Sequence, residues 1–244
     1  MKKLLLIVAA GIFCSSAFAQ DEEAEPEKKN IIKINLPALA FKNISLQYER
    51  AVGKRISVAG TVRLMPKSKL PFRSNISKWA DDAELDRQLG NAEVGNFAVM
   101  PEVRFYLGKK GALRGFYLGP FASFARYNAD LLYEYEDGVT KTIPLSGDVN
   151  TITGGLMIGA QWKLSNAVSL DWWILGPNYG VSRGDLSGKQ ALTPSEQQSL
   201  RDELADLDIP LTKFTYDVNG NGASINFKGP WAGVRAGICI GINF

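Results

Sequence analysis

The sequence predicts an all-β fold, an eight-stranded antiparallel up-and-down transmembrane β-barrel with three long outer loops, two of them partly helical. Three observations lead to this prediction. The chain starts like a secreted protein, eight segments alternate apolar and polar residues, and the connections between them are sorted into short and long ones. Alternating segments of about ten residues, separated by turns, are typical of membrane barrels.

Residues 1–19 are predicted to be a signal peptide. Two lysines precede an apolar run at 4–13, and the small-residue site Ala17-Phe18-Ala19 follows. This order is that of a secretory signal with an A-x-A cleavage site, and the apolar run is too short for a spanning helix. Residues 20–30 are charged and indicate a flexible periplasmic leader. The barrel is expected to occupy residues 31–244.

The composition argues against several classes of function. Because the signal peptide carries two lysines and no acid, its removal lowers the formal net charge from +3 to +1, which gives no strong field for nucleic acid. Histidine is absent, whereas most hydrolytic triads and many metal sites depend on it. The remaining cysteine, Cys239, cannot form an intramolecular disulfide. We therefore expect no enzymatic activity, no cofactor and no bound metal.

Eight segments follow one another along the predicted barrel. In seven of them the apolar residues fall on one face, as the two-residue period of a strand requires. The segment at 114–127 is apolar on both faces, so its facing stays open. The segments lie at 32–36, 44–49, 56–64, 97–106, 114–127, 151–163, 168–174 and 231–244.

The last segment, Trp231 to Phe244, shows the pattern most clearly. Its even-numbered residues from Val234 onward are apolar, whereas the odd-numbered ones are small or polar and include a single charge, Arg235. The even face is expected to contact lipid, and the odd face to leave space in a narrow lumen. We expect this strand to close the barrel against the first one.

Four prolines, Pro37, Pro101, Pro120 and Pro177, lie within the segments or at their ends. Proline has no N–H group to donate to a sheet, and a closed barrel has no free edge where that loss is harmless. Each proline is therefore expected at a bulge, a strand end or an irregular rim, and the strand boundaries around it stay open.

The connections between the segments differ in length. The short ones are predicted near 42–43, 53–54, 108–113 and 165–166, and the long ones at 67–95, 128–148 and 182–230. If the leader lies in the periplasm, all three long connections fall on the outer side. Short periplasmic turns and long outer loops are typical of outer-membrane barrels.

Two long connections contain helix signals. Thr193-Pro194-Ser195-Glu196 is a capping box with proline at the first helical position, and Leu200, Leu204 and Leu207 follow at helical spacing. Residues 77–89 form a second candidate helix. Two interpretations stay open for both segments: a solvated helix folded over the barrel rim, or a contact surface for a partner.

Charged residues on the inward faces are the candidate functional residues. An eight-stranded barrel is just wide enough for side chains to fill, so charges inside it must pair. We expect three acids and three arginines to form a structural ionic plug; the functional alternative is a gated path for a solute or for protons. These barrel-lining charges are Glu49, Arg63, Glu102, Arg104, Asp171 and Arg235, and Lys33, Gln47 and Lys163 are also expected to point inward.

One motif resembles the first half of a calcium-binding loop. Residues Asp217 to Gly222 (DVNGNG) place oxygen donors at alternate positions and glycine at the sixth. The twelfth position is Lys228, where such a loop needs an acid that binds calcium through both oxygens. A Gly-Asn hairpin turn that leads into the last strand is therefore predicted instead.

Three short stretches resemble the small eight-stranded outer-membrane β-barrel proteins of Gram-negative bacteria, including a large uncharacterised group of them. They are ISLQYER at 44–50 with the turn and Ile56-Ser-Val that follow, PEVRFY at 101–106, and the closing Gly-Ile-Asn-Phe244. The resemblance implies insertion into the outer membrane, with Phe244 as the assembly signal that the barrel-assembly machinery reads. It implies no single activity, because such barrels include tethers, adhesins and lipid-modifying enzymes.

The sequence thus favours a non-enzymatic outer-membrane barrel with a structural or surface-interaction role through its long extracellular loops. The expected partners are outer-membrane lipid, the barrel-assembly machinery and an extracellular partner at the loops, but not nucleic acid. One alternative is a barrel that binds or passes a small solute through its lumen or rim. A lipid-modifying enzyme is disfavoured because such enzymes mostly pair serine or aspartate with histidine. A soluble periplasmic calyx would turn its apolar faces inward.

Overall fold

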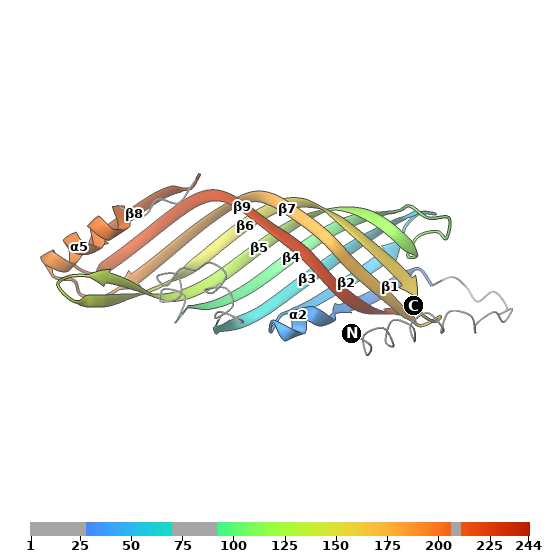
Figure 1. Ribbon diagram of the computed structural model, residues 1–244, viewed down its shortest axis with the longest axis horizontal. Helices are drawn as coiled ribbons and strands as arrows, with labels where there is room; N and C mark the ends of the chain where they lie inside the picture. Colours follow the sequence, from blue (N-terminus) through green and yellow to red (C-terminus); the bar gives the residue numbers. More distant parts are fainter. Residues whose placement is uncertain (1–27, 70–91, 206–210) are drawn as a thin grey trace, which may run out of the picture.

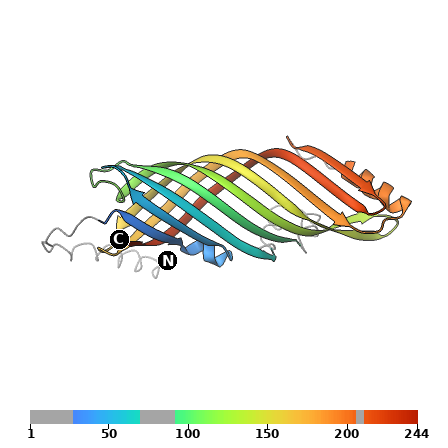
Figure 2. The same cartoon turned by 180° about the vertical axis from the view of Figure 1, so that it is seen from behind.

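The computed structural model of the protein describes residues 28–69, 92–205 and 211–244. Eight strands form a closed antiparallel ring in the order β1-β2-β3-β4-β5-β6-β7-β9, and β1 pairs with β9 (Figures 1 and 2). A further strand, β8, pairs with β9 alone. The predicted signal peptide, the leader up to residue 27, the candidate helix at 77–89 and Leu207 lie outside the described residues.

Each predicted segment corresponds to a strand of the ring, so the fold is the expected all-β, eight-stranded up-and-down barrel of the transmembrane type. The first strand begins at residue 30, one residue before the predicted start of the barrel. The elements are β1 (Asn30–Asn35), α2 (Leu36–Ala40), β2 (Ile44–Ala51), β3 (Ile56–Lys69), β4 (Glu93–Tyr106), β5 (Gly115–Glu136), β6 (Thr140–Lys163), β7 (Val168–Lys189), α5 (Pro194–Ala205), β8 (Lys213–Asn219) and β9 (Gly222–Asn243).

The barrel has two distinct ends, which we call near and distal. The near end carries the carboxyl terminus and the short turns after β2, β4 and β6, whereas the distal end carries α5 and β8 (Figure 1). The three short turns after β2, β4 and β6 therefore lie at the end opposite to α5 and β8, as the sequence predicts, while the short β1–β2 connection lies on the distal side.

The outside of the ring is an apolar belt. On β7, for example, the outward residues from Leu170 to Val181 include Trp172, which is 46% exposed, and Leu175. The span from Leu170 to Val181 is roughly twelve residues long. At the usual rise per residue and a strand tilt of about 45°, it covers about 26 Å along the barrel axis, close to the height of the apolar band of membrane barrels. The apolar faces thus point outward, the opposite of a soluble calyx. Among the described residues, no helix is long and apolar enough to span a membrane.

The last strand closes the ring against the first. Ile242 lies opposite Ile32 and Gly241 lies opposite Lys33. A Cβ atom on Gly241 would lie 2.6 Å from the Ile31 side chain, so only glycine fits there. The Phe244 N–H donates to the Asn30 carbonyl at 2.9 Å, and the Asn30 N–H donates back at 3.1 Å.

The four prolines lie where the sheet is interrupted. Pro37 is in the first turn of the short helix α2, outside any strand. Pro101 and Pro120 lie in a stretch of the β4–β5 ladder, between Val99 and Phe105, where Glu102 is the only described residue of β4 that is paired with β5. Pro177 lies close to the register shifts in the pairing of β7 with β6 and with β9. The absent N–H groups thus fall at bulges, gaps and a helix end, where they cost little.

Two predicted long loops are in large part strands. The segment 128–148 is a hairpin, because β5 runs to Glu136 and β6 begins at Thr140. In the segment 182–230, β7 continues to Lys189 and β9 already begins at Gly222. The prediction ended these strands where the outward apolar alternation ended, whereas each strand continues as long as it has a hydrogen-bonded neighbour. The β1–β2 connection also differs, since α2 precedes the turn.

The distal parts of β5, β6, β7 and β9, together with α5 and β8, form a small layered unit that we call the distal extension (residues 131–146, 182–205 and 211–230; Figure 1). Helix α5 begins at the predicted capping box: Glu196 N donates to Thr193 Oγ1 at 3.3 Å, and Thr193 N donates to Glu196 Oε2 at 2.6 Å. The helix covers an apolar core of Tyr135, Ile143, Leu145, Leu192, Leu200, Leu204, Val218, Ala223 and Ile225.

Candidate functional site

The lumen is lined by alternate residues of the eight strands, and short residues alternate with long charged ones around the ring. Glu49 of β2 lies opposite Ala59 of β3, which lies opposite Glu102 of β4. Asp171 of β7 lies opposite Cys239 of β9, a buried packing residue. Because alanine and cysteine are short, the long charged side chains have room to meet across the barrel axis.

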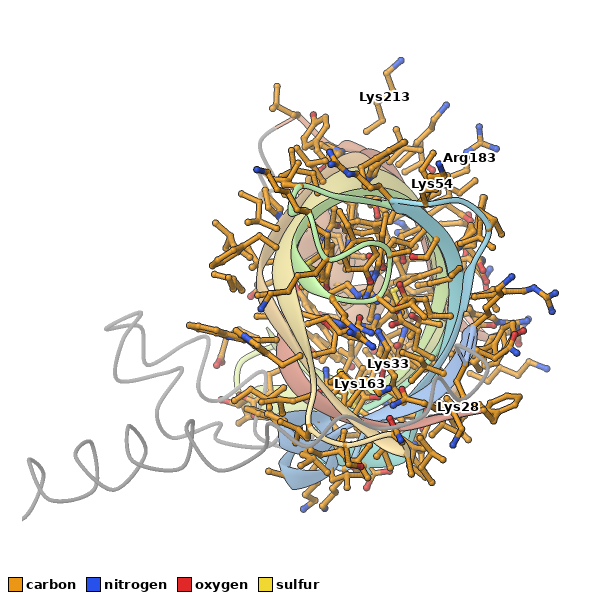
Figure 3. The ribbon with its side chains drawn as sticks, turned by 90° about the vertical axis from the view of Figure 1, so that its right-hand side faces the viewer. Lys28, Lys33, Lys54, Lys163, Arg183 and Lys213 are labelled. Atoms are coloured by element: carbon orange, nitrogen blue, oxygen red, sulfur yellow. The ribbon has the colours of Figure 1, made fainter. Side chains whose placement is uncertain are left out.

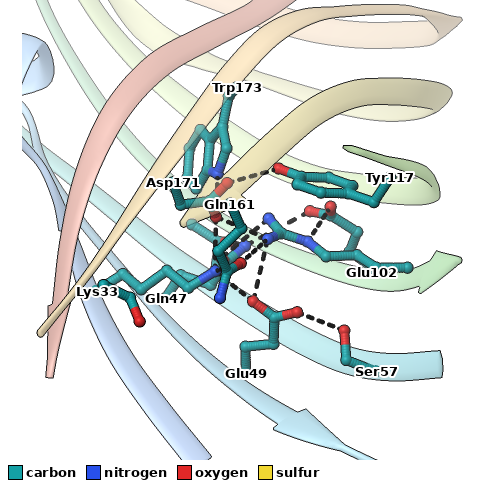
Figure 4. Close-up of polar contacts among 12 residues, drawn as sticks. Lys33, Gln47, Glu49, Ser57, Glu102, Tyr117, Gln161, Asp171 and Trp173 are labelled. Carbon is teal, nitrogen blue, oxygen red and sulfur yellow. Dashed lines mark hydrogen bonds and ion pairs between the residues drawn. The ribbon is translucent and has the colours of Figure 1, made fainter. Parts of the chain in front are cut away.

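Lys33 of β1 reaches into these charges from one side (Figure 4). Its Nζ donates to Asp171 Oδ2 at 2.6 Å and to Gln161 Oε1 at 2.8 Å, and it is paired with the Glu49 carboxylate. The sequence pattern placed Lys33 on the inward face but did not identify it as an ionic partner. The acids that pair with Lys33 lie on β2 and β7. Strand β7 comes close to β1 only in the closed ring, where β9, with Gly241 at this position, lies between them.

Arg104 of β4 binds the acids from the other side. Its Nε donates to Glu102 Oε1 and its Nη1 to Asp171 Oδ2, both at 2.7 Å, and Nη1 also reaches Glu49 Oε2 at 3.0 Å. Its Nη2 donates to Gln47 Oε1 at 3.0 Å. Arg104 is 0% exposed, so water does not reach any of these contacts. All sides of the guanidinium fork are engaged, as a buried arginine requires.

Neutral donors complete the two central carboxylates. Tyr117 Oη donates to Asp171 Oδ1, and Trp173 Nε1 donates to Asp171 Oδ2, both at 2.9 Å. Tyr106 Oη donates to Glu49 Oε1 at 2.6 Å. Each carboxylate thus accepts more bonds than its ion pairs alone provide, which lowers the cost of burying it. The sequence analysis did not single out these aromatic donors.

Arg235 of β9 forms the distal layer of the site. Its Nη1 donates to Glu102 Oε2 at 2.6 Å and its Nη2 to Thr61 Oγ1 at 2.9 Å. The guanidinium also lies over the Trp173 ring, 4.0 Å from the ring centroid, a favourable geometry for a cation–π contact. The strand predicted to close the barrel therefore also supplies a cation to its interior.

Arg63 does not belong to this group, contrary to the predicted set of three arginines. It is only partly buried, and among the described residues its Nε donates to Asn96 Oδ1 at 2.7 Å and its Nη2 to Tyr127 Oη at 3.3 Å. Its level on β3 is nearer the distal opening than those of the acids, so Lys33 takes the expected third cationic position. Lys163, also predicted to point inward, is exposed at the near end.

We call the buried set Lys33, Gln47, Glu49, Glu102, Arg104, Gln161, Asp171 and Arg235 the lumen network. It contains three cations and three acids, so it is formally neutral. The fully buried members expose no surface to solvent, and such side chains cannot line an open aqueous channel. The arrangement closes the lumen at this level and leaves its charged groups engaged with one another.

A second feature lies at the near end, below the lumen network. A cavity of about 300 Å³ opens there, and its uncharged lining residues include Ile31, Ser169 and Asn243. Figure 3, which looks at the near end, shows Lys163 within the outline of the barrel and Lys28 at its edge. The cations that line this mouth pocket are Lys28, Lys29, Lys54, Arg114 and Lys163.

The described residues contain no group of three or more histidine, cysteine, aspartate or glutamate side chains that could hold a metal ion. The calcium-like motif is the predicted hairpin turn: β8 ends at Asn219, β9 begins at Gly222, and Asn221 N donates to Asn219 Oδ1 at 2.9 Å.

Comparisons with known proteins identify a family but no activity. No curated protein sequence matches the chain. Among solved structures, the translocator domain of the autotransporter NalP from Neisseria meningitidis is similar over 100% of this chain and 94% of that domain, with 10% sequence identity and a TM-score of 0.35. A family model matches residues 4–181, which are more than half of the sequence. The chain therefore belongs to the family described as "Protein of unknown function (DUF3575)".

Proposed function

We propose that this protein is a non-enzymatic barrel of the outer membrane that acts at the cell surface through its distal extension. The observation that carries the proposal is the separate apolar core under α5, in which Leu200 and Leu204 are each 1% exposed. A loop that only connected two strands would not need a core of its own. A rigid, capped unit held above the barrel is suited to present a fixed surface to a partner.

The outer membrane is the location that best fits the apolar belt. In water, the exposed side chains on all eight strands would form a far larger apolar surface than soluble proteins carry. Short turns at the near end fit the periplasm, and the distal extension then lies outside the cell. Phe244, hydrogen-bonded to β1 at the closing seam, fits the proposed assembly signal for the barrel-assembly machinery.

The lumen network supports a structural role for the interior. Each of its acids and cations is paired with an opposite charge, although Arg235 Nε has no hydrogen-bond partner among the described residues, and a catalytic or transport group would need a free face toward a substrate or water. We therefore expect no stepwise conductance when the purified barrel is inserted into planar bilayers. Steady single-channel steps from the wild-type protein would contradict the plugged interior.

Labelling of intact cells tests the surface orientation. Gln198→Cys places a thiol on the exposed side of α5, and Lys54→Cys places one in a near-end turn, while the native Cys239 is buried. A membrane-impermeant maleimide should label Gln198→Cys in intact cells and Lys54→Cys only after the outer membrane is permeabilised. The reverse pattern would contradict the proposed orientation.

The mouth pocket favours a second candidate function, the binding of a small anionic solute from the periplasmic side. Five cations without a described acid among the lining residues provide the charge for it. Equilibrium dialysis of the folded barrel against inorganic phosphate and citrate tests this function. A Lys54→Gln, Lys163→Gln variant should lose the binding, whereas Lys213→Gln, at the distal end, should keep it.

A further inference from the structure

A row of basic residues crosses the outside of the barrel at the base of the distal extension. The strand register places Arg126 of β5 opposite Asn150 of β6, and Asn150 opposite Arg183 of β7. Arg183 lies opposite Lys228 of β9, which lies opposite Lys213 of β8. Five adjacent strands thus place these residues, which we call the basic row, along one line of paired positions, which runs obliquely to the barrel axis because the strands are tilted. Figure 3 shows Arg183 and Lys213 pointing away from the barrel.

The basic row begins where the apolar belt ends. A second row of paired residues lies two positions closer to the near end on β5, β6, β7 and β9. It consists of Phe124, Ile152, Val181 and Pro230. Three of these are large apolar side chains, 49% to 56% exposed on the outside. The surface therefore changes from apolar to basic within one pleat of the sheet. On each of these strands, such a change is the one expected where acyl chains give way to headgroups in a membrane.

The basic row also borders a hollow in the surface. A shallow cavity of about 350 Å³ is lined by Arg183, Lys213 and Lys228, with neutral hydrogen-bonding groups from Asn150 and Asn226. Asp185 is the one acid among the lining residues. The three cations therefore outnumber the acids of the hollow by two, and the amides add donors between them.

The ion pairs distinguish the hollow from the rest of the row. Arg126 is paired with Asp148 next to it, so its charge is already balanced. In the part of the chain that the structure describes, no ion pair is found for Arg183, Lys213 or Lys228. Unbalanced cations of like sign on neighbouring strands repel one another, and an anion between them removes that cost.

We propose that this hollow binds the phosphate groups of a phosphorylated lipid headgroup in the outer leaflet. Arginine and lysine recognise phosphate by charge-assisted hydrogen bonds, and arginine can do so through two nitrogens at once. The hollow borders the apolar belt, so the acyl chains of a lipid bound there can lie against Phe124, Ile152 and Val181. This additional contact favours a lipid over a free anion. The inference rests on the proposed insertion into the outer membrane.

The test uses the full-length protein, refolded in a neutral detergent, and three probes: bis-phosphorylated lipid A, the same lipid A without its phosphates, and inorganic phosphate. Binding is measured by native mass spectrometry titration. The Arg183→Gln, Lys213→Gln, Lys228→Gln variant should bind the phosphorylated lipid roughly a hundredfold more weakly, at about fivefold for each cation near a headgroup. The matched control, Arg55→Gln, Lys109→Gln, Lys110→Gln, removes equal charge from exposed near-end residues outside the mouth pocket and should bind like wild type.

Three outcomes overturn the proposal: equal binding of the dephosphorylated lipid, full displacement of the lipid by equimolar inorganic phosphate, or equal losses in the two triple variants. Heat-modifiable migration on a gel establishes that each variant is a closed barrel before its affinity is compared. The two proposals can fail separately. A reversed labelling pattern in intact cells would contradict the proposed surface role, whereas the binding titration in detergent tests the hollow independently of that orientation.

Discussion

The molecule has two interiors that are built from opposite chemistry. The lumen network, around Lys33, Glu49 and Arg104, is ionic and hydrogen-bonded. The core of the distal extension, around Ile143, Leu145 and Leu204, is apolar, although the same strand β6 contributes to both regions of the protein. The two interiors are successive parts of one continuous sheet.

The difference follows from what surrounds each part. Within the belt, most apolar residues face outward, so most of the charged residues are on the inward positions, where a few aromatic side chains such as Tyr117 and Phe121 accompany them. Beyond the belt the sheet is surrounded by water, and its apolar residues must be buried inside as in a soluble protein. On β6 the apolar positions are accordingly even-numbered at Ile152 and Leu156, which are exposed, and odd-numbered at Ile143 and Leu145, which are buried. The reversal marks the edge of the apolar belt.

The largest expected effect comes from breaking the lumen network. Arg104→Met leaves Glu102, Glu49 and Asp171 with too few cations in a buried site, and should destabilise the barrel by about 3–5 kcal/mol. Urea titration in lipid vesicles, with the folded fraction read from cold gel migration, measures the change. Arg114→Met, at the near-end rim, is the control and should lose little.

A balanced variant sharpens this test. Lys33→Met together with Glu49→Gln removes one charge of each sign, so it should be less destabilising than Lys33→Met alone. If the single and the balanced variants are equally unstable, packing rather than charge balance determines the stability of the lumen.

The second effect should be local to the distal extension. Leu204→Ala removes a side chain from the core under α5 and should cost about 2–5 kcal/mol of the stability of that unit. Hydrogen exchange should become faster in α5 and β8, while β2 to β4 stay protected. Leu211→Ala, at a residue that is 86% exposed, is the matched control. Faster exchange throughout the barrel would show that the two interiors are not independent.

Much of the barrel could be predicted because local pattern determines it. The period of two fixed which side chains face outward, as at Ile238 and Ile242 of the closing strand. The facing of the segment 114–127 could not be read, because both of its faces are apolar. The structure places Tyr117 and Phe121 inside, where Tyr117 binds Asp171.

The partners inside the lumen could not be predicted from the same pattern. Lys33 and Arg63 both stand on inward positions, and only the stagger of the strands decides that Lys33 shares a level with the acids. The length of the distal strands was missed for a related reason. The apolar residues there change face, and a search for one continuous alternation stops at the change, near residue 150 on β6.

A smaller effect is expected at the start of α5. Thr193→Ala removes the hydroxyl that accepts from Glu196 N, and should cost about 1 kcal/mol of helix stability. Hydrogen exchange in the first turn of α5 measures it. Thr193→Ser keeps the hydroxyl and should behave like wild type; an equal effect of both variants would exclude the cap as the cause.

The smallest effect is a pH dependence confined to the distal extension. The hydrogen bond from Lys141 Nζ at 2.8 Å, together with the bonds from Thr193, lowers the pKa of Glu196 from 4.5 to about 2. Because the pKa of Glu196 is lower in the folded state, the ionised carboxylate stabilises the distal extension. This stabilisation is complete above the unfolded pKa of 4.5 and is lost as the pH falls from there toward 2. Exchange in α5, corrected for the intrinsic pH dependence of exchange, should therefore accelerate across this interval in the wild type and less in Glu196→Gln, which cannot titrate. Because the lumen network is shielded from water, β2 to β4 should show no matching change over the same interval. Parallel loss of protection in both regions would mean that acid opens the barrel as a whole.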